Sequence, residues 1–269
     1  MHFTTLASGS SGNAILVGEN NRHFLVDCGI SGKSLLHNLS QVNIPNSELE
    51  GIVVTHEHVD HIRGVGILAR KLKIPIYATT GLWEAMSPYL GKLAETQRIE
   101  VQDSFTCAGL EVKLYPTSHD SRESYGLKVS RPKQQDKMHL AIGIATDSGV
   151  ITEEMHRHLK GCDALVVEAN YEDEQLWNGS YPWHLKKRIS GKYGHLENKQ
   201  LAEGLAEWIK ENTQRVVLAH LSEENNTPQI ALSTVTGILR ELNIAKKCPD
   251  VQVRVAPRYT PHELIRLRE

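Results

Sequence analysis

The sequence predicts an α/β fold in which two central β-sheets pack together and helices flank them. Short apolar runs of strand length, rich in β-branched residues, recur along the chain. The first runs follow one another through turn-rich segments, SGSSGN at 8–13 and GENNR at 18–22, which predicts an antiparallel meander. Later runs alternate with helical patterns. Strand clusters separated by helices favour two packed sheets with the helices outside.

Each predicted element rests on its own local pattern. In chain order, the predicted strands lie at 14–17, 24–26, 52–54, 76–78, 110–115, 140–145, 164–167, 216–218 and 251–255. Apolar residues spaced as on one helix face predict helices at 62–71, 80–89, 152–159, 198–210 and 228–242. Pro228 suits the first turn of the last helix, directly after Thr227 as a candidate N-cap. Neither a repeat nor a low-complexity linker interrupts the series, so residues 1–269 are expected to form a single domain.

Composition limits the classes of function. The chain has 269 residues, 23% of them charged, and a formal net charge of −2. This balance excludes a protein that is basic all over, so only a local basic patch can argue for a nucleic-acid partner. The four cysteines are far apart, which argues against a disulfide framework or a cysteine-ligated zinc site. The sequence has neither a secretory signal at its start nor an apolar run near the roughly 20 residues that span a bilayer. A cytoplasmic protein without membrane association is therefore expected.

The segment VVTHEHVDH at 53–61 is the strongest chemical signal in the sequence. Four potential metal ligands, His56, His58, Asp60 and His61, follow a predicted strand within six positions. In an extended chain, residues i and i+2 point to the same side, so His56 and His58 can converge on one ion. Asp60 and His61 come where a helical pattern begins and can face a second ion. The alternative is a polar surface loop that is rich in histidine by chance.

Three further residues follow predicted strands in the same way. His119 comes after EVKLYPTS, Asp147 after LAIGIAT and His220 after RVVLA. Each alone is more typical of a hydrogen-bonded surface residue than of a ligand. Together they are expected at the edge where the loops converge. Imidazole and carboxylate are ligands that zinc, manganese and iron accept.

In this order, THEHVDH, His119, Asp147 and His220 resemble the motif series of the metallo-β-lactamase superfamily. LVDCG at 25–29 is similar to the first motif of that family, where the aspartate is structural; we therefore expect Asp27 to support the ligand loop. The resemblance implies an αββα sandwich with two divalent metal ions, zinc or manganese with iron as a further option. By the same resemblance, the first ion is held by His56, His58 and His119, the second by Asp60, His61 and His220, and Asp147 bridges both.

The stretch YPWHLKKRISGKYGHLENKQLAEGLAEW at 181–208 helps to choose among hydrolases. Gly194 and His195 resemble the Gly-His element of the RNase Z-like and RNase J-like nucleases, where the histidine touches the scissile phosphate or assists the leaving group, so His195 is also a candidate substrate-binding residue. An imidazole can donate a proton near neutral pH, which suits phosphodiester cleavage. The alternative is a histidine near a helix N-terminus with no catalytic role.

The same stretch places cations beside aromatic residues. Lys186, Arg188 and Lys192 are candidate substrate-binding residues, since cations suit phosphates and neighbouring aromatics suit bases. The alternative is a solvated basic helix face. In SGSSGN, Ser11 and Asn13 are candidates for contacting a phosphate, although most such loops are only tight turns.

Taken together, LASGSSGN, VDCG, THEHVDH, TSHD, ATDSG, VEANY and RISGKYGHLEN are similar to the YycJ/VicX (WalJ) group of bacterial metallo-β-lactamase-fold hydrolases. The resemblance implies a metal-dependent 5′-to-3′ exonuclease that acts on DNA ends. The candidate catalytic residues are Asp60, Asp147 and His195, with a hydroxide between the two ions as the nucleophile. The alternatives are a glyoxalase II-like ester or thioester hydrolase and a non-catalytic, metal-stabilised nucleic-acid-binding module. The oligomeric state stays open, with a homodimer as one option.

Overall fold

Two mixed β-sheets form the centre of the protein. The computed structural model describes residues 1–132 and 138–268, and within them each sheet has seven strands. The first sheet consists, in spatial order, of β14 (Ile265–Arg266), β1 (His2–Ala7), β2 (Ala14–Glu19), β3 (Arg22–Val26), β4 (Leu49–Val53), β5 (Ile76–Ala78) and β6 (Arg98–Glu100). The second consists of β13 (Gln252–Val255), β12 (Arg215–Ala219), β11 (Ala164–Glu168), β10 (Ala141–Ala145), β9 (Tyr125–Ser130), β8 (Leu110–Pro116) and β7 (Ser104–Cys107).

Each sheet combines an antiparallel meander with a parallel half. The strands from β14 to β3 pair antiparallel, as the turn-rich N-terminal segment predicts, and those from β3 to β6 pair parallel. In the second sheet, β7 to β10 pair antiparallel and β10 to β13 pair parallel. Parallel neighbours end at the same edge of a sheet, so the loops that follow them meet there.

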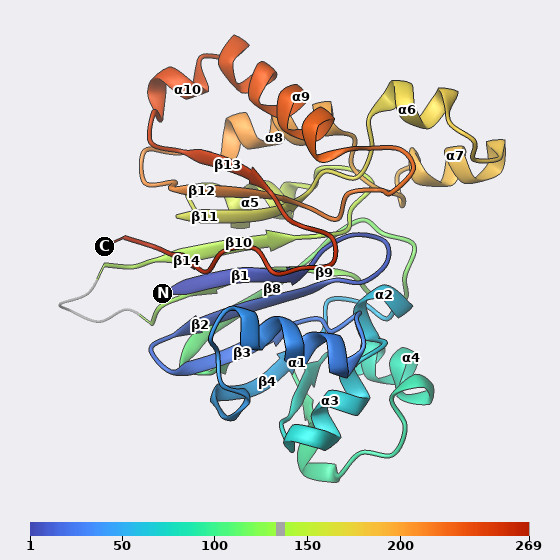
Figure 1. Cartoon of the computed structure of the whole chain (residues 1–269), viewed down its shortest axis with the longest axis vertical. Coiled ribbons are helices and arrows are strands. Elements are labelled where there is room, and N and C mark those ends of the chain that lie inside the picture. Colours follow the sequence, from blue (N-terminus) through green and yellow to red (C-terminus); the bar gives the residue numbers. More distant parts are fainter. Residues whose placement is uncertain (133–137, 269) are drawn as a thin grey trace.

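Helices cover the outer faces of the two sheets (Figure 1). Over the first sheet lie α1 (Gly32–Gln41), α3 (Val65–Leu72) and α4 (Thr80–Leu90), with the short α2 (Val59–Ile62) at the edge. Over the second lie α5 (Glu153–Leu159), α8 (Asn198–Trp208), α9 (Pro228–Glu241) and α10 (Ile244–Lys247). The helices α6 (Asp173–Asn178) and α7 (Trp183–Ile189) project from one side of the sandwich (Figure 1).

Three buried apolar layers hold this αββα sandwich together. Phe3 and Phe24 of the first sheet and Ile142 of the second belong to one cluster between the sheets. A second cluster joins the first sheet to its helices, with Leu68 as a fully buried member, and a third joins the second sheet to its helices around Trp208. The predicted fold class is confirmed. None of the helices in the described part of the chain combines the length and the apolar character that crossing a bilayer requires.

The predicted helix at 62–71 is wrong in one respect, because the chain breaks there into α2 and α3. Gly64 lies at the break, and its backbone N–H donates to the Cys28 carbonyl at 2.7 Å. A Cβ on Gly64 would come within 2.2 Å of the Ile30 carbonyl oxygen. The short α2 therefore packs directly against the loop that follows β3, which brings Asp60 and His61 close to Asp27.

Candidate metal centre

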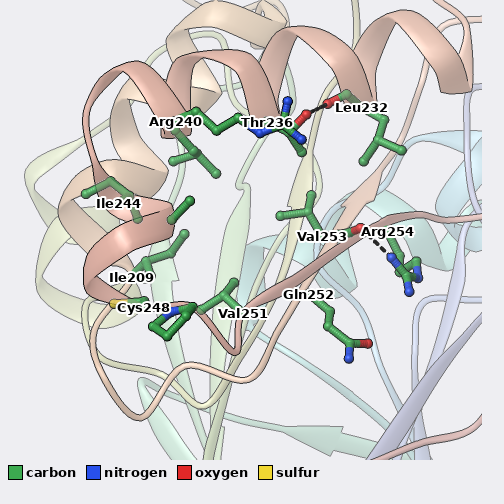
Figure 2. A pocket seen from close by; sticks show the side chains of 13 residues that line it. Ile209, Leu232, Thr236, Arg240, Ile244, Cys248, Val251, Gln252, Val253 and Arg254 are labelled. Carbon is green, nitrogen blue, oxygen red and sulfur yellow. Dashed lines mark hydrogen bonds between the residues drawn. The ribbon is translucent and has the colours of Figure 1, made fainter.

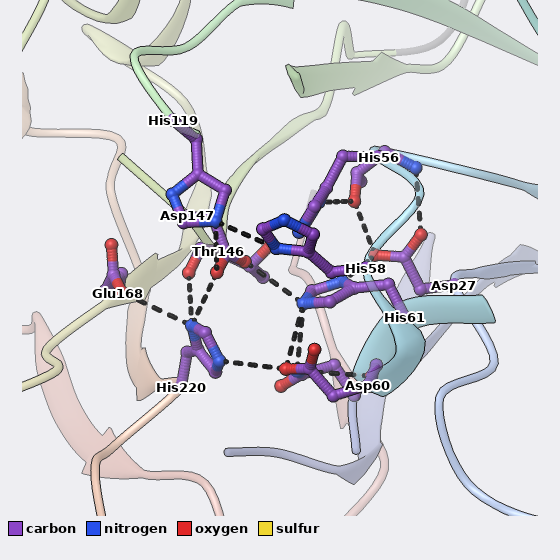
Figure 3. Close-up of polar contacts among 12 residues, drawn as sticks. Asp27, His56, His58, Asp60, His61, His119, Thr146, Asp147, Glu168 and His220 are labelled. Atoms are coloured by element: carbon purple, nitrogen blue, oxygen red, sulfur yellow. Dashed lines mark hydrogen bonds and ion pairs between the residues drawn. The ribbon is translucent and has the colours of Figure 1, made fainter. Parts of the chain in front are cut away.

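Loops from both sheets bring the seven predicted ligands together at one edge of the sandwich (Figure 3). His56 and His58 follow β4, and Asp60 and His61 lie on α2. The other three follow strands of the second sheet: His119 after β8, Asp147 after β10 and His220 after β12. Among the described residues, four groups have donor atoms that lie within 4.8 Å of one another: His56, His58 and His119; Asp60, His61 and His220; His56, His61 and Asp147; and Asp147, His220, Glu168 and His195.

The first group is made of three imidazoles. His119 Nε2 lies 3.2 Å from His58 Nδ1, and the rings of His56 and His119 are 5.1 Å apart. His119 Nδ1 donates to the Gly194 carbonyl at 2.9 Å, so Nε2 is the nitrogen that carries a free lone pair toward the group. His56 is fully buried, and burial, followed by the neighbouring His61, lowers its pKa well below the ordinary value. A neutral imidazole is the form that binds metal.

The second group combines two imidazoles and a carboxylate. Asp60 Oδ2 lies 3.6 Å from His61 Nε2 and 3.4 Å from His220 Nε2. His220 Nδ1 lies 2.9 Å from the Thr146 carbonyl, which can only accept, so Nε2 is the nitrogen that would face a metal ion. Without an ion, although burial lowers it, the neighbouring carboxylates of Asp147 and Asp60 hold the pKa of His220 well above its ordinary value. Although burial raises it, His61 and His220 lower the pKa of Asp60 to about 2, so this carboxylate is ionised at neutral pH.

Asp147 lies between the two groups. Its Oδ2 is 3.2 Å from His61 Nε2, and its Oδ1 is 3.8 Å from His119 Nε2. The side chain is buried, which raises the pKa of its carboxyl, yet His220, His61 and His56 together hold that pKa well below the usual range. Asp147 is thus an ionised carboxylate with an oxygen near each group.

Buried polar atoms that lack hydrogen-bond partners indicate whether this cluster fits metal ions. His56 Nε2, His220 Nε2 and Asp147 Oδ2 are buried, and none has a hydrogen-bond partner among the described residues. A buried polar atom without a partner costs about 1–3 kcal/mol, so three at one place need an explanation. Divalent cations satisfy all three, because each atom presents a lone pair toward the other ligands. The residues therefore fit a two-metal site of imidazole and carboxylate ligands, which zinc, manganese and iron accept.

Asp27 orients one histidine in each of the first two groups through its Nδ1 atom: His61 directly, and His56 through Thr55. Its Oδ2 accepts from His61 Nδ1 and from the Thr55 hydroxyl, both at 2.7 Å. Because the Thr55 proton goes to Asp27, the hydroxyl oxygen accepts from His56 Nδ1 at 3.0 Å. Asp27 itself belongs to none of the donor groups found in the described residues. The expectation that Asp27 supports the ligand loop is confirmed.

Backbone strain also marks the centre. Asp27 has a φ of 63° and His220 a φ of 52°, in the left-handed region that residues other than glycine rarely adopt. The strained backbone of His220 is held by Ser8, whose hydroxyl accepts from the His220 N–H at 2.8 Å. Such strain persists only where the surroundings fix it, and it concentrates at functional sites.

The structure places the two candidates in SGSSGN differently. Asn13 is buried, and its amide nitrogen lies 3.1 Å from His61 Nε2 and 3.4 Å from Asp60 Oδ2, so its side chain faces the second group of ligands. The carbonyl of Ser11 accepts from the Arg63 side chain at 3.3 Å, and its neighbour Ser10 is the residue that lines the cavity beside the ligands. Contact of Ser11 or Asn13 with a phosphate stays a prediction.

His195 lies beside the ligands and is backed by a glutamate that the sequence reasoning missed. His195 Nδ1 is 2.6 Å from Glu168 Oε1, and its ring is 5.0 Å from that of His119 and 5.2 Å from that of His220. Glu168 is fully buried and also lies 3.2 Å from His220 Nδ1. Glu168 ends β11, which lies between the strands that lead to Asp147 and His220. In the sequence, an acidic residue at the end of an otherwise apolar strand is the pattern that could have indicated it.

A cavity of about 240 Å³ opens onto the centre. Its lining comprises Ser10, His58, Asp60, Asp147, Asn170, Tyr181, Leu185, Arg188, Ile189, His195, His220 and Ser222. Of the three predicted basic residues, Arg188 lines this cavity, and its Nε donates to Asp120 Oδ2 at 2.5 Å. Lys192 is exposed on the loop before Gly194. Lys186 differs: its buried ammonium donates to the carbonyls of Trp177 at 2.8 Å and Gly179 at 2.7 Å, which favours a structural role over substrate binding.

A larger cavity, of about 370 Å³, shares no lining residue with the one at the ligands; Figure 2 shows the side chains around it. It is formed by α9, α10 and β13, and residues such as Ile209, Leu232 and Val253 give it an apolar lining. It contains neither histidine nor carboxylate, and Cys248 is its single thiol. Despite its size, this cavity offers no group for hydrolysis, so the smaller cavity at the metal centre is the candidate active site.

Comparison with known proteins agrees with this geometry. The model of the β-lactamase superfamily domain matches residues 22–221. Exodeoxyribonuclease YycJ of Bacillus anthracis is 37% identical over 243 residues, 90% of each chain. Exodeoxyribonuclease WalJ of Streptococcus pneumoniae serotype 2 (strain D39) is 35% identical over 246 residues, 90% of this chain and 89% of that protein. The solved structure of Zn²⁺-bound PqqB from Methylobacterium extorquens gives a TM-score of 0.70 at 16% identity, covering 98% of this chain and 100% of that one; this likeness concerns the fold alone.

Proposed function

The chain belongs to the β-lactamase superfamily of hydrolases, and from this premise we propose that it is a two-metal phosphodiesterase that removes nucleotides from DNA ends in the 5′-to-3′ direction. The two relatives called exodeoxyribonucleases match it over nine-tenths of its length, which supports DNA as the substrate. His56, His58 and His119 would hold one ion, Asp60, His61 and His220 the other, and Asp147 would contact both. When bound, the ions supply an ionised water near neutral pH and neutralise charge on the attacked phosphate.

The position of His195 is the observation that carries the proposal. Its Nδ1 is 2.6 Å from the buried carboxylate of Glu168, which accepts the Nδ1 proton. Nε2 is then the nitrogen available to reacting groups in the cavity, beside the ligands His119 and His220. A phosphodiester needs a proton on its departing oxygen, and a positioned imidazole contributes typically about 10²–10⁴-fold to such a step.

Other residues of the cavity suit the rest of a phosphodiester. Arg188 is paired with Asp120 at 2.5 Å through Nε, and its side chain is 59% exposed, so its remaining N–H groups can donate to a non-reacting phosphate oxygen. Tyr181 and Asn170 line the same cavity with polar groups. A small ester or thioester has no use for an arginine and an ordered histidine placed beyond the ligands, which disfavours the glyoxalase II-like alternative.

Cleavage of end-labelled DNA tests the proposal. The full chain, loaded with Mn²⁺ or Zn²⁺, is incubated with 5′-labelled and 3′-labelled DNA, with RNA of the same sequence and with the thioester S-lactoylglutathione. We expect labelled mononucleotides from the 5′-labelled DNA at once, and a ladder that shortens gradually from the 3′-labelled DNA. His195→Asn should lower the rate by about 100-fold or more. His184→Asn is the matched control, because this exposed histidine of α7 is absent from the cavity lining.

The other outcomes identify the alternatives. Turnover of the thioester without cleavage of DNA would support an ester or thioester hydrolase. Bound metal with no turnover of any substrate would support a non-catalytic module. Equal activity of wild-type protein and His195→Asn on DNA would contradict the role given to His195.

A further inference from the structure

Two tryptophans, one exposed and one half-buried, form a pair on the projecting helices α6 and α7. The ring centroids of Trp177 and Trp183 are 5.3 Å apart with an interplanar angle of 48°. Trp183 is 66% exposed, whereas the other two of the four tryptophans, Trp83 and Trp208, are buried. Trp177 is half-buried, so the pair presents one largely exposed ring, that of Trp183, to solvent.

The pair is held in place by contacts that do not involve the catalytic residues. Trp177 Nε1 donates to Asp173 Oδ1 at 2.8 Å, and its carbonyl accepts from the buried Lys186 ammonium at 2.8 Å. Lys187 Nζ lies 5.3 Å from the Trp177 ring centroid and 4.9 Å from that of Trp183, within cation–π range of both. Lys186 thus anchors α7 to the end of α6, and Lys187 places a positive charge against the two rings.

The pair also adjoins the active-site cavity. Helix α7 carries Trp183 of the pair and Lys187, which lies against both rings. The same helix contributes Leu185, Arg188 and Ile189 to the cavity lining. Trp183 precedes Arg188 by five residues, which is about 7.5 Å of rise along a helix. Five residues also turn the helix by about 140°, so Trp183 lies on a different face of α7 from Arg188, and a strand whose phosphate meets Arg188 would reach Trp183 by continuing around the helix.

We propose that the Trp177–Trp183 pair is a stacking platform for unpaired bases of the DNA strand next to the cleaved phosphodiester, with Lys187 beside the backbone. This inference rests on the proposed function for its substrate class. Aromatic rings with adjacent cations are how proteins bind single strands irrespective of sequence. Apart from the ion pair of Arg188 with Asp120, the exposed cations are Lys187 and Lys192, and of the two exposed acids of α6, Asp173 and Glu174, Asp173 is engaged with Trp177. This balance favours a nucleic-acid strand over an apolar protein partner.

Tryptophan fluorescence provides a direct test, because of the four tryptophans only the pair is positioned to meet a ligand. The full metal-loaded chain is titrated with phosphorothioate dT12, a single strand that resists hydrolysis. We expect quenching that saturates with binding. Trp183→Ala should raise the Kd, followed by fluorescence anisotropy of labelled dT12, by about 5- to 100-fold, since stacking on one aromatic ring has that effect. Trp183→Phe keeps a ring and should bind nearly as well as wild type.

Tyr89→Ala is the matched control, since Tyr89 is 72% exposed but lies on α4, away from the cavity. Its Kd should equal that of wild type. If dT12 leaves the fluorescence unchanged, or if Trp183→Ala binds within two-fold of wild type, the platform is refuted. Binding is read without cleavage, so this result is separate from any failure of the nuclease assay.

Discussion

Two clusters of buried histidines lie at opposite ends of β1 and differ in what surrounds them. At one end, the residue after the strand, Ser8, accepts from the His220 N–H in the metal centre. At the other end, His2 Nε2 and His23 Nε2 are 2.8 Å apart and hydrogen-bond to each other. His23 Nδ1 lies 3.4 Å from the Glu48 carboxylate, and neither histidine belongs to a potential metal-binding group in the described residues.

The two clusters differ in which ring nitrogens of their histidines have hydrogen-bond partners. In the metal centre, outer partners hold the Nδ1 atoms: Asp27 for His61, Gly194 for His119 and Thr146 for His220. The Nε2 atoms are thereby left facing one another. In the pair of His2 and His23, the Nε2 atoms bond directly to each other, so no lone pairs converge. Partners that orient the rings from behind, and not the mere presence of buried histidines, therefore indicate a metal site.

Of the changes that test this comparison, removing the charge of Glu168 should have the largest effect, which is on the rate of DNA cleavage. Glu168 lies behind His195 at 2.6 Å and His220 at 3.2 Å, so Glu168→Gln loses an ionic acceptor for both rings. We expect the rate of DNA cleavage to fall by about 100-fold or more at saturating metal, with the thermal midpoint little changed. Glu48→Gln, the equivalent change beside His23, should leave the rate unaltered. Equal rates for the two variants would show that Glu168 does not position the centre.

Asp27→Asn should have a smaller effect, on metal affinity. The carboxylate accepts from the Thr55 N–H with Oδ1 and from the Thr55 hydroxyl and His61 Nδ1 with Oδ2, whereas an amide has only one accepting oxygen. Asp27→Asn therefore loses an acceptor either for the Thr55 backbone or for the Thr55 hydroxyl and His61, which weakens the orientation of His56 or of His61. Affinity for metal, measured by competition with a chelating dye, should fall by about 10- to 100-fold. Asp163→Asn removes another buried carboxylate, one that accepts from the Ala141 N–H at 2.8 Å, and should leave the affinity unchanged. A similar loss in both variants would mean that general destabilisation is responsible.

The smallest effect concerns stability at the far end of β1. Burial, followed by the nearby His23, lowers the pKa of His2 from 6.5 to about 4. Since the folded state resists protonation there, its stability is complete above pH 6.5 and is lost as the pH falls toward 4. Metal-free wild type should lose up to about 3 kcal/mol more than His2→Gln between pH 7 and 4 in urea unfolding. Parallel pH profiles of the two proteins would contradict this interpretation.

The sequence predicted those parts of the fold and the site that local patterns encode. Each of the seven ligands lies just after a recognisable strand or in the helix that follows it. Parallel pairing of β10, β11 and β12 brings Asp147 and His220 to one edge, whereas His119 follows a strand of the antiparallel half and the histidine-rich loop belongs to the other sheet, so packing of the two sheets completes the group. Lys186 shows what local patterns cannot predict. It stands among cations in the sequence, yet its role depends on the carbonyl of Trp177, which packing brings to it.

Three other features were not predicted for the same reason, because they depend on residues that only the fold brings together. Strand β1 was overlooked because HFTTLA contains polar residues, although every one of its residues is buried. Glu168 was overlooked because its function depends on His195 and His220, which lie 27 and 52 positions away in the chain. The break at Gly64 requires the neighbouring loop at Ile30, so the helical pattern alone could not show it.

The metal content of the purified chain tests the central claim most directly. After dialysis against buffer with trace metal, elemental analysis should find two divalent ions per wild-type chain and two in His2→Gln. His119→Ala and His220→Ala should each retain about one, because each removes a ligand from a different group. Wild-type protein that holds no metal, or a loss of metal in His2→Gln equal to that in His220→Ala, would contradict the account.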